Sequence, residues 1–88
     1  MKNNRPKKRD NLLYRELDGE GIIYDQKNSM VHTLNPTATL IWNYCDGKQS
    51  TKDIAKKLIK KYDTSLDNAL KDIEKTLKNL KNLKLLME

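Results

Sequence analysis

An α+β fold, in which a three-stranded antiparallel sheet precedes three helices, is predicted by two features of this 88-residue sequence. Residues 12–34 alternate short apolar runs with polar turns, which is typical of strands. Residues 36–86 repeat their apolar side chains at helical spacing instead. A chain of this length has room for one such domain and a thin core.

Three strands are expected in the first half of the chain. The first is Leu12–Leu17, and Asp18–Gly21 follows as a turn because glycine tolerates a positive φ angle. Gly21–Asp25 is the second strand, rich in β-branched and aromatic residues. The polar turn Gln26–Ser29 leads into the third, Met30–Leu34. Short turns between consecutive strands favour an antiparallel meander.

Alternation along the third strand separates its side chains into two sets. Met30, His32 and Leu34 are expected on one face, and Val31 and Thr33 on the other. A sheet of three strands is marginal by itself, so one face must pack on the helices.

The first helix is expected to begin at Asn35-Pro36, because asparagine suits the N-cap and proline the first helical position. It should run to about Cys45, where Asp46-Gly47 offers a stop. The second helix is expected to begin after Ser50, which forms a capping box with Asp53.

The second helix should end at the break in residues 63–65, after which Ser65 offers a new N-cap. The third helix carries one narrow apolar seam and ends near Asn82: the seam is Leu66, Leu70, Ile73, Leu77 and Leu80. Three strands followed by three helices suggest a winged helix-turn-helix domain.

Composition excludes several classes of protein. One Cys excludes a disulfide framework and a Cys-rich zinc site, and one His excludes a His-based metal cage. The chain has neither a membrane-length apolar stretch nor the apolar region of a signal peptide. We therefore expect a cytoplasmic protein without a cofactor, a bound metal or a membrane partner.

The net charge of +6 is unevenly distributed. Residues 1–9 carry +5, residues 10–47 carry −4 and residues 48–88 carry +5. We expect residues 1–10 to form a basic, flexible tail and residues 11–88 to form the domain. The tail is either a solvated terminus or an arm for nucleic acid or an acidic peptide, and charge alone does not separate these.

Catalysis finds little support in the sequence. His32 has no Asp or Ser patterned beside it, and Cys45 lies near a helix C-terminus, which does not favour a thiolate. Cys45 and Trp42 are better interpreted as core residues. We therefore predict that the protein is not an enzyme.

Binding is the remaining activity, and two surfaces suit it. An outer strand of the sheet presents unpaired backbone groups to which a peptide strand can add. The third helix carries a cationic stripe: Lys71, Lys75, Lys78 and Lys81. Such a stripe is either a solvated face or a contact for phosphates or carboxylates.

The central part of the chain resembles the PqqD-like family. The residues that carry the resemblance are Leu34-Asn35-Pro36-Thr37-Ala38, Ile41-Trp42 and Asp46-Gly47, followed by Thr51, Ile54-Ala55, Leu58, Tyr62, Ala69, Asp72, Leu77, Leu80 and Leu85-Leu86. The resemblance spans about residues 12–86. It departs from the family where Asn82-Leu83-Lys84 replaces a helix-ending glycine, and the basic residues of 1–9 have no counterpart.

This resemblance implies a function as well as a winged helix-turn-helix fold. Members are peptide chaperones, or RiPP recognition elements, which bind the leader segment of a ribosomally made precursor peptide. They present it to a modifying enzyme, such as a radical-SAM, cyclising or protease enzyme. The leader adds beside the third strand and lies against the third helix. Carried over, the binding residues are Met30, Val31, His32, Thr33, Leu34, Leu70, Lys71, Glu74, Lys75 and Lys78.

Two other functions remain as alternatives. A winged helix could bind nucleic acid, but the third helix has no Arg, and its amides before the C-terminal end are only Asn68 and Asn79. A small oligomerising module could use the apolar seam, although that seam is the only stripe available for the core. We therefore favour a peptide over nucleic acid as the partner.

Overall fold

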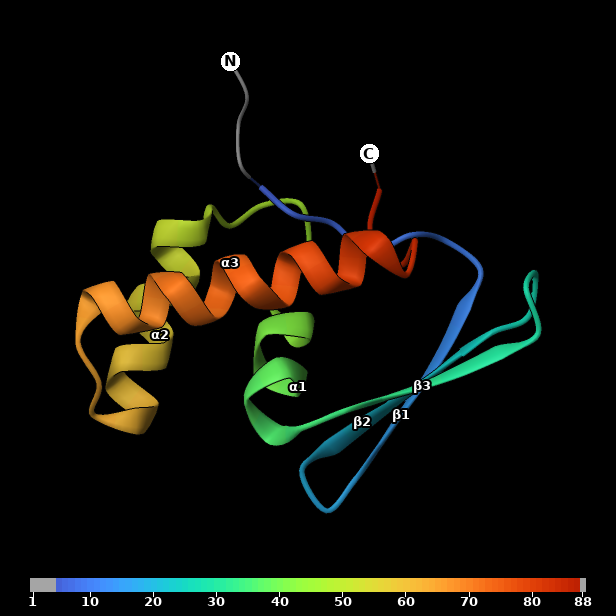
Figure 1. The fold of residues 1–88 in the computed structure, drawn as a ribbon, viewed down its shortest axis with the longest axis horizontal. Helices are drawn as coiled ribbons and strands as arrows, with labels where there is room; N and C mark the ends of the chain where they lie inside the picture. The colour runs from blue at the N-terminus through green and yellow to red at the C-terminus, as the bar shows by residue number, and fades with distance from the viewer. Residues whose placement is uncertain (1–4, 88) are drawn as a thin grey trace.

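The structure, a computed structural model, describes residues 5–87 and confirms the predicted order of elements in that range. The elements are β1 (Leu12–Leu17), β2 (Glu20–Asp25), β3 (Met30–Leu34), α1 (Pro36–Asn43), α2 (Thr51–Tyr62) and α3 (Leu66–Asn82). The sheet extends to one side of the helices, and α3 runs across α1 and α2 (Figure 1). The fold is the expected α+β, winged helix-turn-helix arrangement.

The sheet is an antiparallel meander in which β2 is central and β1 and β3 are the edges. Ile23 in β2 lies opposite Tyr14 and His32, and its side chain is fully buried. The next residue, Tyr24, is 38% exposed. Because side chains alternate along a strand, the sheet has one face toward the helices, where β2 and β3 contact α1, and one open face.

Helix caps set where α1 and α2 begin. The Asn35 side chain accepts a hydrogen bond from the Ala38 N–H at 2.8 Å, with Pro36 in the first turn. The capping box of Ser50 and Asp53 is present in both directions. These local signals involve only neighbouring residues, so both helix starts were predicted correctly.

The end of α1 differs from the prediction, whereas α3 ends at Asn82 as predicted. α1 ends at Asn43, before Cys45, because the Tyr44 and Cys45 N–H groups bond back three residues and tighten the last turn. Beyond the end of α3, Lys84 takes the left-handed conformation, with φ at 61°. The Leu85 N–H then donates to the Leu80 carbonyl at 2.9 Å, which turns the chain back onto the core.

One cluster of buried apolar side chains joins the inner face of the sheet to the helices and to the C-terminal segment. Its members are Ile23, Leu34, Ile41, Trp42, Cys45, Ile54, Ala55, Leu58, Ala69, Ile73, Leu80, Leu85 and Leu86. The core roles predicted for Trp42 and Cys45 are confirmed. The apolar seam of α3 therefore packs in the core, except that Leu66 at the start of the helix is 41% exposed.

Residues 6–9 are not the flexible tail that the charge pattern suggested. The Lys8 N–H donates to the Cys45 carbonyl at 3.1 Å, and the Arg9 N–H donates to the Leu85 carbonyl at 2.9 Å. This segment therefore lies between the α1–α2 connection and the C-terminal segment. The sequence did not predict this packing, because the contacts are backbone hydrogen bonds, which do not depend on side-chain type.

Arg9 also ties the segment to the sheet. Its Nη2 lies 2.7 Å from Asp25 Oδ2, and its Nε donates to the Lys84 carbonyl at 2.8 Å. Hydrogen bonds from Asn28, together with Arg9, lower the pKa of the buried Asp25 carboxyl to about 2. Residues 1–4 of the predicted tail lie outside the described residues.

Candidate functional site

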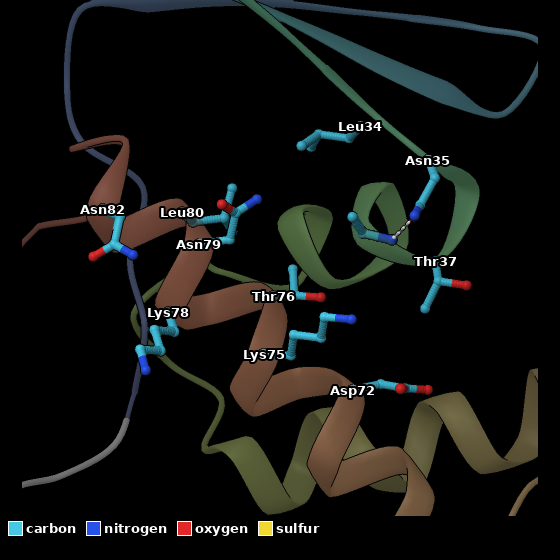
Figure 2. A pocket seen from close by; sticks show the side chains of 11 residues that line it. Leu34, Asn35, Thr37, Asp72, Lys75, Thr76, Lys78, Asn79, Leu80 and Asn82 are labelled. Atoms are coloured by element: carbon cyan, nitrogen blue, oxygen red, sulfur yellow. Dashed lines mark hydrogen bonds between the residues drawn. The ribbon is translucent and has the colours of Figure 1, made fainter.

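An open cavity of about 490 Å³ lies between the junction of β3 with α1 and one face of α3. Figure 2 shows Leu34 and Thr37 on the first wall and Lys75 and Thr76 on the second, while Lys78 and Asn82 point away from α1. We call it the β3–α3 groove, and it is lined by Leu34, Asn35, Thr37, Ala38, Asp72, Lys75, Thr76, Lys78, Asn79, Leu80 and Asn82.

The first wall exists because the chain turns sharply from strand to helix. β3 ends at Leu34, and Asn35 caps α1 at once. The turn leaves Thr37 and Ala38, in the first turn of the helix, beside the end of the strand. Short side chains at these positions keep the cavity open.

A buried hydroxyl holds this wall in place. The Gly21 N–H donates to Thr39 Oγ1 at 2.7 Å, and Thr39 Oγ1 donates to the Leu34 carbonyl at 3.3 Å. Thr39 is 3% exposed, so water does not compete for these bonds. The hydroxyl thereby joins α1 to Gly21 and Leu34, the pair at one end of the β2–β3 ladder.

The second wall is one face of α3. Asp72, Lys75, Thr76 and Asn79 recur at intervals of three and four residues, which places them along one side of the helix. In Figure 2, Lys75 and Thr76 extend from α3 toward α1. The adjoining side of the helix carries the buried Ile73, which anchors α3 to the core.

The groove combines an apolar floor with a polar rim. Leu34, Ala38 and Leu80 supply apolar carbon, while two lysines, one aspartate and several amides and hydroxyls surround it. The lysines Lys75 and Lys78 outnumber the single acid. Such a surface suits a ligand with alternating apolar and polar groups, including some acidic ones.

An exposed strand edge leads into the groove. β3 pairs only with β2 in the described sheet, so its other side lacks a strand partner there. Met30 is 49% and Val31 63% exposed, whereas Leu34 is buried and lines the groove. A peptide that follows this edge would therefore arrive between β3 and α3.

Only some of the predicted site residues lie at the β3 edge or in the β3–α3 groove. Met30 to Leu34 form the edge strand, and Leu34, Lys75 and Lys78 line the groove. The other three predicted helix residues are not among its lining: Leu70 packs partly against the core, and Lys71 and Glu74 are exposed away from it. The reason is helix phase, which sequence spacing alone did not fix.

Several lining residues were missed by the sequence analysis. They are Asn35, Thr37, Ala38, Asp72, Thr76, Asn79, Leu80 and Asn82. One pattern could have found most of those on α3, because they follow the side of the helix next to its apolar seam. Asn35 was predicted as a helix N-cap, and Thr37 and Ala38 were quoted as carriers of the family resemblance, but none of the three was predicted as a site residue.

Residues 5–87 contain no group of three or more His, Cys, Asp or Glu side chains that could hold a metal ion. Burial raises the pKa of the Cys45 thiol to about 12, so the thiol stays protonated. In the same range, no helix has the length and apolar character needed to cross a membrane.

Comparison with protein families assigns the chain. Residues 20–86 match the model of the family described as Coenzyme PQQ synthesis protein D (PqqD). The chain belongs to the PqqD family. The match begins at the first residue of β2 and includes both walls of the β3–α3 groove. The resemblance in the sequence is thereby confirmed, while a search of the curated proteins gave no match.

Two solved structures share this PqqD-family fold. One is TbiB1 in complex with the TbiA(beta) leader peptide, at 19% sequence identity and a TM-score of 0.83. The similarity covers 91% of this chain and 93% of that one. The other is a lasso peptide synthetase B1 complexed with the leader peptide, at 23% identity and a TM-score of 0.85. It covers 96% of this chain and 99% of that one.

Proposed function

We propose that this PqqD-family protein is a non-catalytic chaperone that binds the leader segment of a ribosomally made precursor peptide. A separate enzyme, of the radical-SAM or lasso-pathway type, would modify the peptide that the chaperone presents. The observation that carries the proposal is the meeting of an exposed strand edge with the β3–α3 groove. Both solved structures of the same fold are described as complexes with a leader peptide.

Affinity in this mechanism comes first from the backbone. The leader adds beside Met30–Leu34 as a fourth strand, and main-chain hydrogen bonds replace those that the free edge makes with water. These backbone hydrogen bonds do not distinguish one peptide sequence from another, because nearly all residues carry the same backbone groups. Selectivity must therefore come from side chains.

The groove supplies that selectivity. An apolar leader side chain would pack on the floor formed by Leu34, Ala38 and Leu80. An acidic leader side chain would lie near Lys75 and Lys78 on the rim. We therefore expect the leader to carry an apolar residue and an acidic residue within the stretch that passes along α3.

The decisive experiment is a calorimetric titration with the leader of the precursor peptide encoded beside this gene. We expect a one-to-one complex with a dissociation constant below tens of micromolar. The absence of any binding heat at protein and peptide concentrations of tens of micromolar would overturn the proposal. Val31→Pro should weaken the complex, because proline disturbs backbone hydrogen bonding along the edge strand. Unchanged affinity with an intact fold would point to a different edge.

A charge reversal tests the role of the groove. The double variant Lys75→Glu, Lys78→Glu should weaken an acidic leader by about tenfold, since exposed pairs contribute about 0.2–1 kcal/mol each and reversal adds repulsion. The double variant Lys71→Glu, Lys81→Glu is the matched control, because both residues are exposed lysines of α3 outside the groove lining and the change in net charge is the same. An equal loss in both variants would show that only net charge matters.

A further inference from the structure

The face of the sheet that points away from the helices carries a row of exposed apolar side chains. Leu13, Tyr24 and Val31 lie opposite one another across the three strands. They are 54%, 38% and 63% exposed. Leu17, four residues along β1 from Leu13 and so on the same face, is 61% exposed. We call these four side chains the outer apolar row.

The charges on this face nearly cancel. By the same alternation, the face also holds Arg15, with Ile22 and Thr33 opposite it across the sheet, and Glu20, which lies opposite Leu17. One cation and one anion give the face no net attraction for a strongly charged ligand such as nucleic acid. Its partner should therefore be a protein surface that is largely apolar.

The size of the row decides against a second copy of this chain as the occupant. Four side chains exposed by 38–63% present on the order of 300–400 Å² of apolar surface. Two such rows stacked together would bury roughly 600–800 Å² of apolar surface, whereas a specific interface buries about 1,200–2,000 Å² in total. The row is thus the apolar centre of a larger contact, and that contact needs further surface.

The bound peptide would supply such surface. Val31 belongs both to the outer apolar row and to the edge strand at which, under the proposed function, the leader adds. A strand added there would place every second side chain on the same face, next to Val31 and Thr33. The row would continue without a break from the protein onto its peptide.

We propose that the outer apolar row, extended by the added peptide strand, is the docking surface for the peptide-modifying enzyme. This inference rests on the proposed function and adds the surface that the partner recognises. The enzyme contacts protein and peptide together, so it binds the loaded chaperone more tightly than the empty one. By thermodynamic reciprocity, the enzyme also tightens the hold of the chaperone on its leader.

The test uses the full chain, the leader peptide and the purified modifying enzyme encoded beside this gene. Leu13→Lys and Leu17→Lys place a charge in the row on β1, away from the β3 edge. Each should leave leader affinity within twofold of the wild type and weaken enzyme binding to the loaded complex by at least tenfold. Leu66→Lys is the matched control, because Leu66 is an exposed leucine of α3 outside the sheet.

Four outcomes would overturn this docking surface. The first is unchanged enzyme binding in both Leu13→Lys and Leu17→Lys, the second is an equal loss of enzyme binding in Leu66→Lys, and the third is no enzyme binding by the loaded wild type. A wild-type dimer in sedimentation that Leu13→Lys dissociates would assign the row to a second copy and also refute the inference. Absence of leader binding in the separate titration would instead refute the proposed function, so the two failures are distinguishable.

Discussion

Thr39 offers a sharp test of how the fold positions the groove. Its hydroxyl lies between the Gly21 N–H and the Leu34 carbonyl, at 2.7 and 3.3 Å, in a site from which water is excluded. Thr39→Val preserves the shape of the side chain and removes both bonds. We expect the domain to lose stability without a change of fold.

The magnitude follows from the two backbone groups that the substitution leaves buried. An unsatisfied buried donor or acceptor costs about 1–3 kcal/mol. With one short and one long bond broken, the expected loss in the free energy of unfolding is about 2–4 kcal/mol. Small domains have about 5–15 kcal/mol in total, so this loss is a large fraction of their stability.

Urea denaturation followed by circular dichroism measures this loss. With a slope of about 1–2 kcal/mol per molar urea, the midpoint should fall by about 1–4 M. Thr39→Ser is the matched control, because it keeps the hydroxyl and removes only a methyl group. Its midpoint should lie much closer to that of the wild type. Leader affinity of the folded Thr39→Val protein should also fall several-fold, because Leu34 loses its fixed place against α1.

The reasoning fails if Thr39→Val unfolds within about 0.5 kcal/mol of the wild type, since buried polar groups left unpaired cost more than that. It fails equally if the serine and valine variants lose the same stability, because the methyl group rather than the hydroxyl would then matter.

Two further predictions concern the buried titratable groups. The pKa of Asp25 is about 2 in the folded protein against an ordinary 3.8, so its carboxylate stabilises the fold above about pH 4, and this contribution is lost as the pH falls toward about 2. Asp25→Asn should flatten that part of the pH–stability curve, and an unchanged slope would contradict the ion pair. Cys45 is buried with its pKa at about 12, so a thiol reagent at pH 8 should label it only as fast as the protein unfolds. Rapid labelling without denaturant would show that the site opens locally.

The helix starts and the strand order were predictable from the sequence because they depend on neighbouring residues. Asn35-Pro36 and the Ser50–Asp53 capping box act within one turn of helix. The polar turn Gln26–Ser29 likewise separates β2 from β3 without help from the rest of the fold. The family resemblance rested on such local features together with their spacing.

The candidate site was predictable in part. The sequence located the strand and the helix that form the walls, because alternation and helical spacing identify both. It did not establish which side of α3 faces β3, and so it included Lys71 and Glu74 and omitted Thr76 and Asn79. The apolar seam determines which face of α3 meets the core, but not which of its two flanking sides lies beside β3, and packing against α1 decides that.

The sequence by itself determined the element order, the caps and the residues available for a core, because each of these depends on contacts within a few residues. Only the tertiary structure decided where distant segments meet. It placed residues 6–9 against the C-terminal segment, Arg9 beside Asp25, and the hydroxyl of Thr39 between two strands. Such contacts are made by backbone groups and by single long-range pairs, whose partners no local pattern specifies.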